Sequence, residues 1–183
     1  MGFLINELKS GDITPNLTKC VAEWRNKNLK YFFDQKPVSE ESSRNFLENK
    51  VRDSDSIFAV AFNNGGAVGH IGIIKGPSGS EPELDNLIVG GRAEGHYVAD
   101  ELEKWAIAYS RDIIRAKSVG LKLLSHNFLA KRLHLENGFA KIEELKLHET
   151  QAGENRNFSV CRSTGCELHH STEKAEYWQL IFR

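Results

Sequence analysis

The stretch Leu87–Ala106, LIVGGRAEGHYVADELEKWA, predicts a buried strand, a glycine-containing turn and then a long helix. Val98, Leu102 and Trp105 recur at spacings of three and four, the pattern of a helix with one buried face. The first amides of a helix have no acceptor within it and carry partial positive charge. The turn at Gly91–His96, where glycine allows close approach, is therefore a candidate cradle for a phosphate group.

The composition is that of a single globular domain spanning residues 1–183, with 40% hydrophobic and 27% charged residues. The net charge of −1 gives no electrostatic reason to expect nucleic acid or an anionic membrane as a partner. Three cysteines, and a start without the pattern of a secretory leader, indicate a reducing compartment, so we expect a cytoplasmic protein. No apolar run approaches the roughly 18 residues of a membrane span.

Working outward from the opening stretch, strands and helices alternate in a way that requires part of the sheet to be parallel. Thr14 and Ser39 are expected to cap the first two helices, and the buried face of the third is expected to continue to Tyr109 and Ile113. The tail at 148–174 is polar and is expected to be irregular. Strands are expected at 3–9, 57–62, 67–75, 81–90, 118–125, 139–147 and 175–183, and helices at 14–28, 38–53, 96–115 and 127–138.

A second segment, LKLLSHNFLAKRLHLENGFAKIEE at 121–144, carries the more specific pattern. Its Asn127, Ala130, Leu133-His134 and Gly138-Phe139 resemble the Asn-x-x-Ala-x-x-Leu-Tyr-x-x-x-Gly-Phe signature of the GNAT superfamily of acyl-CoA-dependent N-acyltransferases. Upstream, Arg92 and Gly95 match the first and fourth positions of that family's Arg/Gln-x-x-Gly-x-Gly/Ala motif. The resemblance covers about half of the chain, roughly 57–147, and departs from the family at Tyr97 and at His134.

The resemblance implies a mixed α/β fold with one twisted sheet of six to seven strands flanked by about four helices. It also implies acetyl-CoA as co-substrate, no metal, and direct attack by an amine on the thioester. His134 takes the place of the family's tyrosine as the group expected near the sulfur. A backbone amide at a bulge in the fourth strand is expected to stabilise the developing oxyanion. The cofactor would lie along Leu87, Ile88, Val89, Arg92, Ala93, Glu94, Gly95, His96, Tyr97, Asn127 and Ala130.

Candidates for the general base that would deprotonate the amine come from the strand before the glycine turn. Glu83 and Asp85 are two apart and so share one face, and carboxylates in an apolar strand are costly unless paired or solvated in a cleft. Both are candidates for binding or deprotonating the amine, Asp85 more than Glu83, whose other interpretation is an exposed strand start. Three other polar residues have a structural alternative: a surface position for His134, a helix cap for Asn127 and a structural histidine for His70.

The acceptor is expected to bind at the end of the expected helix 14–28 and in the aromatic segment that follows it. Trp24, Arg25, Tyr31, Phe33 and His70 are candidate substrate-binding residues, with core packing as the alternative for the aromatic ones. This region is similar to that of GNAT members that acylate nucleotide-linked amino sugars, protein N-termini or aminoglycosides. We therefore expect a small-molecule amine as the acceptor. Acetylation of a protein, a non-catalytic CoA-binding module, and assembly as a homodimer remain open.

One cysteine–histidine cluster stands apart from these motifs. Cys161, Cys166, His169 and His170 lie within ten residues, but their spacing differs from that of common zinc sites. A polar loop is the favoured interpretation, and a zinc site is the alternative.

Overall fold

The computed structural model describes residues 4–64, 66–77, 80–90, 95–153, 155–161 and 170–182. Within these ranges the chain forms one sheet and four α-helices, with short 3-10 turns at Ser10–Asp12 and Leu29–Tyr31. The elements in chain order are β1 (Leu4–Glu7), α1 (Pro15–Lys27), α2 (Glu40–Arg52), β2 (Ser56–Asn63), β3 (Gly66–Ile74), β4 (Glu83–Val89), α3 (Gly95–Asp112), β5 (Ser118–Leu124), α4 (Phe128–Glu136), β6 (Ala140–Ala152), β7 (Asn155–Val160) and β8 (His170–Ile181).

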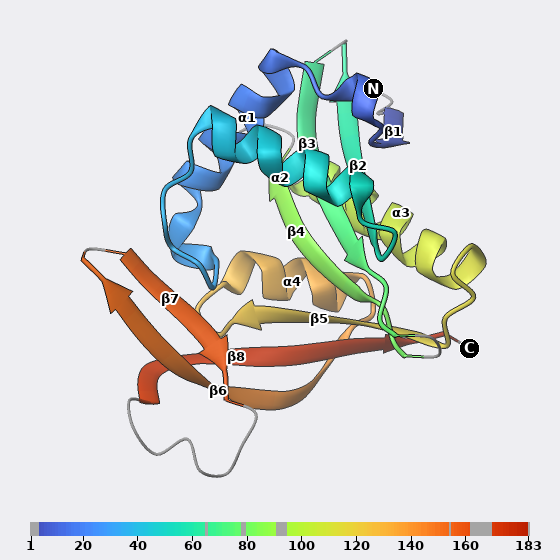
Figure 1. Ribbon diagram of the computed structural model, residues 1–183. Helices are drawn as coiled ribbons and strands as arrows, with labels where there is room; N and C mark the ends of the chain where they lie inside the picture. The colour runs from blue at the N-terminus through green and yellow to red at the C-terminus, as the bar shows by residue number, and fades with distance from the viewer. Residues whose placement is uncertain are drawn as a thin grey trace.

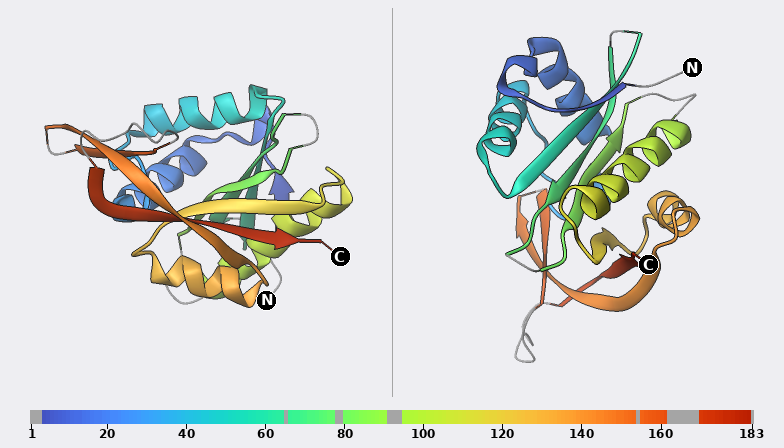
Figure 2. Two further views of the ribbon diagram at one scale, coloured as in Figure 1. Left: turned by 90° about the horizontal axis from the view of Figure 1, so that it is seen from below. Right: turned by 90° about the vertical axis from the view of Figure 1, so that its right-hand side faces the viewer.

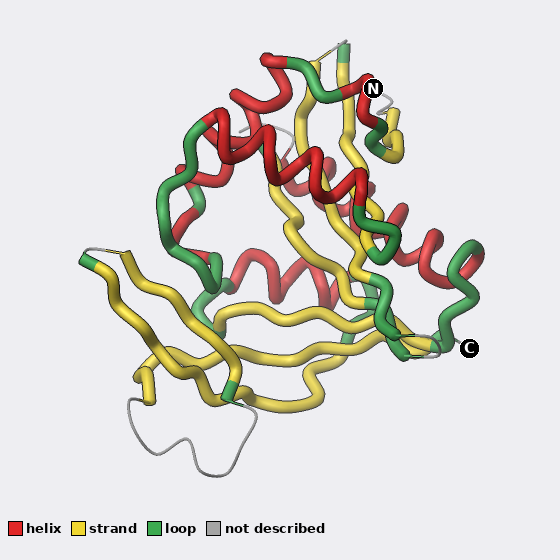
Figure 3. The backbone as a smooth tube through the Cα atoms, viewed as in Figure 1, coloured by secondary structure: helices red, strands yellow, loops and turns green. Residues whose placement is uncertain are grey.

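The sheet has the strand order β1-β2-β3-β4-β5-β8-β6-β7 (Figure 1). Its neighbours are antiparallel except for β4 and β5, which are parallel and joined by the crossover helix α3. This confirms the expected mixed α/β fold and its partly parallel sheet. The strong twist between the β1–β4 half and the β5–β8 half is visible in the backbone trace of Figure 3.

The helices cover both faces of the sheet, with α1 and α2 on one face and α3 and α4 on the other (Figure 2). Leu102 of α3 and Leu47 of α2 are fully buried, each within the core cluster on its own face. Burying one such side chain stabilises the fold by about 1.5–3 kcal/mol. The strands between these helices are therefore an interior layer, as in β2, where apolar residues lie on both faces.

The predicted starts of α1 and α2 are confirmed. Thr14 Oγ1 accepts a hydrogen bond from the Leu17 amide at 3.2 Å, and Ser39 Oγ accepts one from the Ser42 amide at 3.1 Å. Each cap satisfies an amide that the helix itself leaves unpaired. The predicted end of α3 is wrong, because Arg115 adopts a left-handed φ of 61° that terminates the helix, leaving Ile113 65% exposed.

The expectation of an irregular tail is also wrong. The strand β6 continues to Ala152, β7 follows it as a hairpin partner, and β8 begins at His170, so the sheet has eight strands. The side chains of this hairpin are largely polar because one of its faces is solvated, which hid the strands in the sequence.

The β6–β7 hairpin also pairs with the connection between α1 and α2. The Gln35 amide donates to the Arg156 carbonyl at 2.9 Å, and the Phe158 amide donates to the Phe33 carbonyl at 2.8 Å. Phe33 and Phe158 pack in a third apolar cluster below this pairing. Two segments more than a hundred residues apart in sequence therefore lie side by side, joined by backbone hydrogen bonds.

Candidate active site

The parallel strands β4 and β5 separate soon after they meet. They pair at Glu83↔Gly120 and Leu84↔Leu121, although both strands continue beyond these residues. Figure 1 shows the resulting V-shaped gap, with α4 lying behind it. From Asp85 onward the backbone of β4 that faces β5 has no partner strand within the described strands. An extended ligand could therefore hydrogen-bond to this edge as an added strand.

A bulge in β4 begins where the gap opens. Gly72 of β3 pairs with Asp85 and His70 pairs with Ile88, so Asn86 and Leu87 together oppose a single residue. Asn86 has a left-handed φ of 51°, a conformation that asparagine adopts more readily than most residues. The bulge lies at the start of the predicted stretch 87–89 and includes the residue before it. Both residues of the bulge, Asn86 and Leu87, line the cavity described below.

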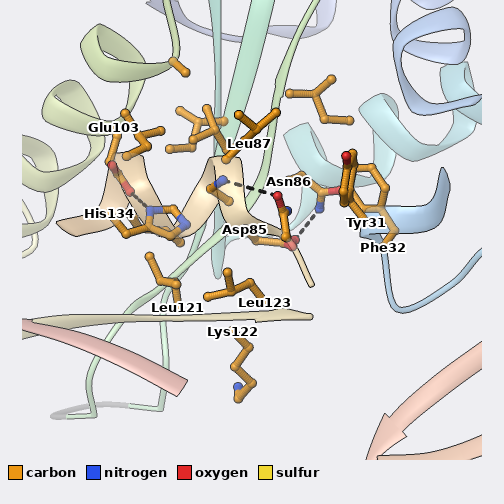
Figure 4. Close-up of a pocket in the computed structure, with 18 of the residues that line it drawn as sticks. Tyr31, Phe32, Asp85, Asn86, Leu87, Glu103, Leu121, Lys122, Leu123 and His134 are labelled. Carbon is orange, nitrogen blue, oxygen red and sulfur yellow. Dashed lines mark hydrogen bonds and ion pairs between the residues drawn. The ribbon is translucent and has the colours of Figure 1, made fainter. Parts of the chain in front are cut away.

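A cavity of about 900 Å³ occupies this gap (Figure 4). Its wall combines the bulged strand, the beginning and middle of α4, one turn of α3 and the connection between α1 and α2. The lining residues used below are Asn28, Tyr31, Phe32, Phe33, Glu83, Asp85, Asn86, Leu87, Ile88, Val89, Glu103, Lys122, Asn127, Ala130, Arg132, His134, Phe158 and Val160.

His134 lies in the cavity wall with its imidazole held at one end. It is only 6% exposed, so the alternative of a surface histidine is wrong. Its Nδ1 lies 2.5 Å from Oε1 of Glu103, a fully buried residue of α3. Asn137 Nδ2 donates to the other oxygen of Glu103 at 2.7 Å.

The two predicted carboxylates of β4 both line the cavity, and both are paired with lysines. Asp85 Oδ2 lies 3.6 Å from Lys50 Nζ of α2 and also accepts a hydrogen bond from the Asn86 side chain. Glu83 forms an ion pair with Lys122 on β5. Since each carboxylate has a cation beside it, the burial that the sequence made costly is offset by pairing.

The sequence matches the model of the acetyltransferase (GNAT) family over residues 21–139. The chain belongs to the GNAT family of acetyltransferases. Among curated proteins, none matches this sequence. The fold of this acetyltransferase is similar to that of a ribosomal-protein-alanine N-acetyltransferase from Brucella melitensis, at 20% identity and a TM-score of 0.69, over 98% of this chain and 99% of that one.

Two further solved structures resemble the acetyltransferase in fold and contain the cofactor. A spermidine N-acetyltransferase from Vibrio cholerae, in complex with CoA and spermine, has 17% identity and a TM-score of 0.71, over 98% of this chain and 95% of that one. An N-acetyltransferase from Campylobacter jejuni, in complex with acetyl coenzyme A, has 14% identity and a TM-score of 0.61, over 98% of this chain and all of that one.

Of the eleven residues predicted to bind the cofactor, the structure brings five to the cavity. Leu87, Ile88, Val89, Asn127 and Ala130 all line it. The Asn127 side chain also accepts a hydrogen bond from the Ala130 amide at 3.3 Å, which confirms the capping interpretation.

The glycine turn itself is only partly described. Arg92, Ala93 and Glu94 lie outside the described residues, while Gly95 and His96 form the first turn of α3. Tyr97 is half exposed and is not part of the cavity wall. Tyr97, which replaces the small residue that the family prefers, therefore does not block the cavity between β4 and β5.

Of the residues predicted to bind the acceptor, Tyr31 and Phe33 line the cavity, together with Phe32. Arg25 lies behind them, with its guanidinium carbon 3.5 Å from the centre of the Phe32 ring. Its Nη2 donates to the Asp34 carbonyl at 2.6 Å, while its buried Nη1 has no hydrogen-bond partner among the described residues. Burial lowers the pKa of Arg25 to about 10, opposed by the charges of Asp34 and Asp85, so the side chain stays cationic at neutral pH.

Trp24 and His70 occupy the interior beside the cavity instead of its wall. The two rings stack with centroids 6.0 Å apart, and the His70 ring also lies 4.9 Å from that of Phe58. Burial lowers the pKa of His70 to about 4, although the Asn86 backbone opposes this shift, so the ring is neutral at physiological pH. The structural alternative therefore describes His70 better than a substrate contact does, and Trp24 belongs to the core.

Several cavity residues were absent from the sequence predictions, above all Glu103, Lys122, Asn28 and Arg132. Glu103 had one usable signal. It lies next to Leu102 on the buried stripe of α3, where a carboxylate is unexpected. Lys122 had a weaker one, as a single charge in the apolar strand β5.

The cysteine–histidine cluster is only partly described. Cys161 lies directly after β7, His170 begins β8, and Cys166 and His169 lie outside the described residues. In the described part of the chain no group of three or more His, Cys, Asp or Glu residues is placed to hold a metal ion. None of the described helices has the length and apolar character needed to cross a membrane.

Proposed function

We propose that this chain transfers the acetyl group of acetyl-CoA to the primary amine of a small molecule. One observation carries the proposal: a single cavity opens at the β4 bulge with His134 in one part of its wall and Asp85 in another. Acetyl-CoA would supply an acetyl group already activated as a thioester. The free edge of β4 and the start of α3 fit such a carrier, since one can pair with amide groups of its arm and the other favours phosphate.

Three groups of the chain would then assist amide formation. Asp85 would hold the ammonium form of the acceptor and pass its proton to solvent. A backbone amide at the Asn86–Leu87 bulge would donate to the carbonyl oxygen as negative charge develops there. His134 would give a proton to the departing sulfur.

The charges around the cavity favour an acceptor that is not a polycation. Asp85 and Glu83 each lie beside a lysine, so the cavity has little net negative charge to attract several ammonium groups. Lys50 and Asn86 both approach Oδ2 of Asp85, which leaves Oδ1 for a single ammonium group. The Arg25 guanidinium lies behind the aromatic wall and stays cationic, so its positive charge favours an anionic group such as a phosphate in front of that wall. A nucleotide-linked amino sugar combines an amine, a phosphate and a ring that can stack on Tyr31 and Phe32, so we place it first.

Two alternatives differ in what they require of the cavity. Acetylation of a protein N-terminus would bring an extended peptide to the same aromatic wall, and the Brucella neighbour is named as a ribosomal-protein-alanine N-acetyltransferase. A non-catalytic module would bind acetyl-CoA without using His134 or Asp85. We keep as predictions a single domain over residues 1–183 and a cytoplasmic location, with a homodimer as one assembly to be tested.

The proposal is tested by following thiol release from acetyl-CoA with a panel of amines. The panel contains a nucleotide-linked amino sugar, a peptide with N-terminal alanine, and spermine. We expect turnover with the first, and a loss of about 100-fold or more in Asp85→Asn, within the range of a lost acid–base group. Asp55→Asn, an exposed carboxylate outside the cavity, serves as the matched control and should keep full activity.

Acetyl-CoA binding is measured separately by thermal stabilisation. A ligand at 100 times its dissociation constant adds about 2.7 kcal/mol to the free energy of unfolding. Stabilisation without turnover on any amine would favour the non-catalytic module. The absence of both thermal stabilisation and turnover at millimolar acetyl-CoA would refute the proposal.

A further inference from the structure

Glu103 is an ionisable residue in a place where a leucine would be expected. It is fully buried on α3, beside Leu102, on a helix whose Val98 and Ala106 belong to the same apolar cluster. Taking a carboxylate out of water costs several kcal/mol unless partners compensate for it. A role in packing alone would not need that cost, because an apolar side chain could fill the same space.

The partners of Glu103 both come from the end of α4. His134 Nδ1 lies 2.5 Å from one carboxylate oxygen, and Asn137 Nδ2 donates to the other at 2.7 Å. Because Asn137 occupies the second oxygen, the carboxylate cannot rotate freely around the imidazole. Phe139 limits the ring further, with an edge-on contact at 5.8 Å between centroids.

The contact fixes which nitrogen of His134 is available for chemistry. An ionised carboxylate only accepts hydrogen bonds, so Nδ1–H donates to Glu103 and Nε2 is the nitrogen that can exchange a proton with another group. Figure 4 shows Glu103 at one side of the ring and the opposite side of the ring facing into the cavity. Both residues line the cavity, so the proton exchange would occur inside it.

We propose that Glu103 is a positioning residue that holds His134 with its proton on Nδ1 and presents Nε2 to the sulfur of the acyl thioester. This rests on the proposed acetyl transfer. As the amine nitrogen forms the new bond to the acyl carbon, the carbon–sulfur bond breaks and its electron pair stays on sulfur. His134, protonated on both nitrogens, gives its Nε2 proton to that sulfur and is left neutral with the Nδ1 proton on the Glu103 side.

The first test compares Glu103→Gln with Glu101→Gln. Both changes remove one negative charge from α3, but Glu101 does not line the cavity. We expect Glu103→Gln to lower kcat by about 10- to 100-fold, the range for groups that orient a histidine, with the KM for acetyl-CoA changed less than about twofold. The pH profile of kcat should also move in Glu103→Gln and stay in place in Glu101→Gln.

The second test needs no activity. Two-bond proton–nitrogen correlation spectra of histidine-labelled protein show which imidazole nitrogen carries the proton. Recorded at a pH where His134 is neutral, the spectra should show its proton on Nδ1 in the wild-type protein, with that preference lost in Glu103→Gln and kept in Glu101→Gln. A neutral wild-type ring protonated on Nε2 alone would overturn the inference, as would equal kcat and pH profiles in the two variants. If the wild-type protein acetylates no amine, the proposed function fails, and the spectra alone still decide whether Glu103 orients His134.

Discussion

Replacing His70 with phenylalanine should make the acetyltransferase less sensitive to mild acid. The His70 ring is 1% exposed between Phe58 and Trp24, and although the Asn86 backbone lies near enough to affect its pKa, neither ring nitrogen reaches hydrogen-bond geometry with a partner among the described residues. Phenylalanine has a similar shape and no nitrogen to leave unpaired, so it suits these aromatic neighbours. The change therefore removes a titrating group with little disturbance of packing.

The size of the effect follows from the pKa of His70. In the folded protein burial lowers that pKa to about 4, while an unfolded histidine has a pKa of about 6.5. Between these values the unfolded chain binds more protons, so the free energy of unfolding falls as the pH falls. For one such group the loss between pH 7 and pH 5 is about 2 kcal/mol. A loss of this size lowers the melting temperature of a protein this long by about 4–8 °C.

Urea unfolding at pH 7, 6 and 5 measures this difference directly. The range stays above pH 4.5, the ordinary pKa of a glutamate, where a carboxylate such as Glu149, whose pKa is lowered by its hydrogen bond to Arg156, would begin to contribute. The control is His148→Phe, which removes a partly exposed histidine of β6. If His70→Phe loses as much stability as the wild type between pH 7 and pH 5, the buried neutral state of His70 is refuted.

Three further changes test the local structure. Gly90→Ala should prevent stable folding, because a Cβ at Gly90 would overlap the Trp24 indole, whereas Gly11→Ala meets nothing within 4 Å and should be tolerated; soluble yield and circular dichroism compare the two. Thr14→Ala should lower the free energy of unfolding by about 1 kcal/mol through loss of the α1 cap, and Thr14→Ser should retain most of it; equal urea midpoints for the two would contradict the capping role. Gly138→Ala should cost about 1 kcal/mol or more in the same assay, since Gly138 has a φ of 88°, and an unchanged midpoint would show that this conformation is not strained for alanine.

The parts of the fold that could be predicted are those fixed by local chemistry. Thr14 and Ser39 stand at helix starts because their hydroxyls satisfy free amides, and Gly138 stands at a helix end because it adopts a positive φ. The hairpin of β6 and β7 could not be predicted in this way. Its strands are held by pairing with distant segments, and its outer face shows the polar composition of a loop.

The candidate site was predictable where a residue's position follows from its strand or motif, and not where it depends on tertiary contacts. Asp85 and His134 could be named from the sequence, but their partners could not. Lys50 lies on α2, 35 residues before Asp85, and Glu103 lies on α3, 31 residues before His134. The bulge could be expected in β4, yet its start at Asn86 depends on register with β3. His70 was ambiguous because a neutral buried histidine and a ligand-binding one look alike in sequence.

The β6–β7 hairpin, which pairs with the α1–α2 connection, contributes to one part of the cavity and not to the other. Phe158 and Val160 reach the cavity from the hairpin, whereas the edge of β4 that faces β5 is formed without it. Under the proposed function, exchanging the hairpin for that of another member of the fold would therefore change which amines are accepted, while leaving the edge of β4 intact. Part of the amine selectivity would then be encoded late in the chain, in addition to the part encoded by Tyr31 and Phe32.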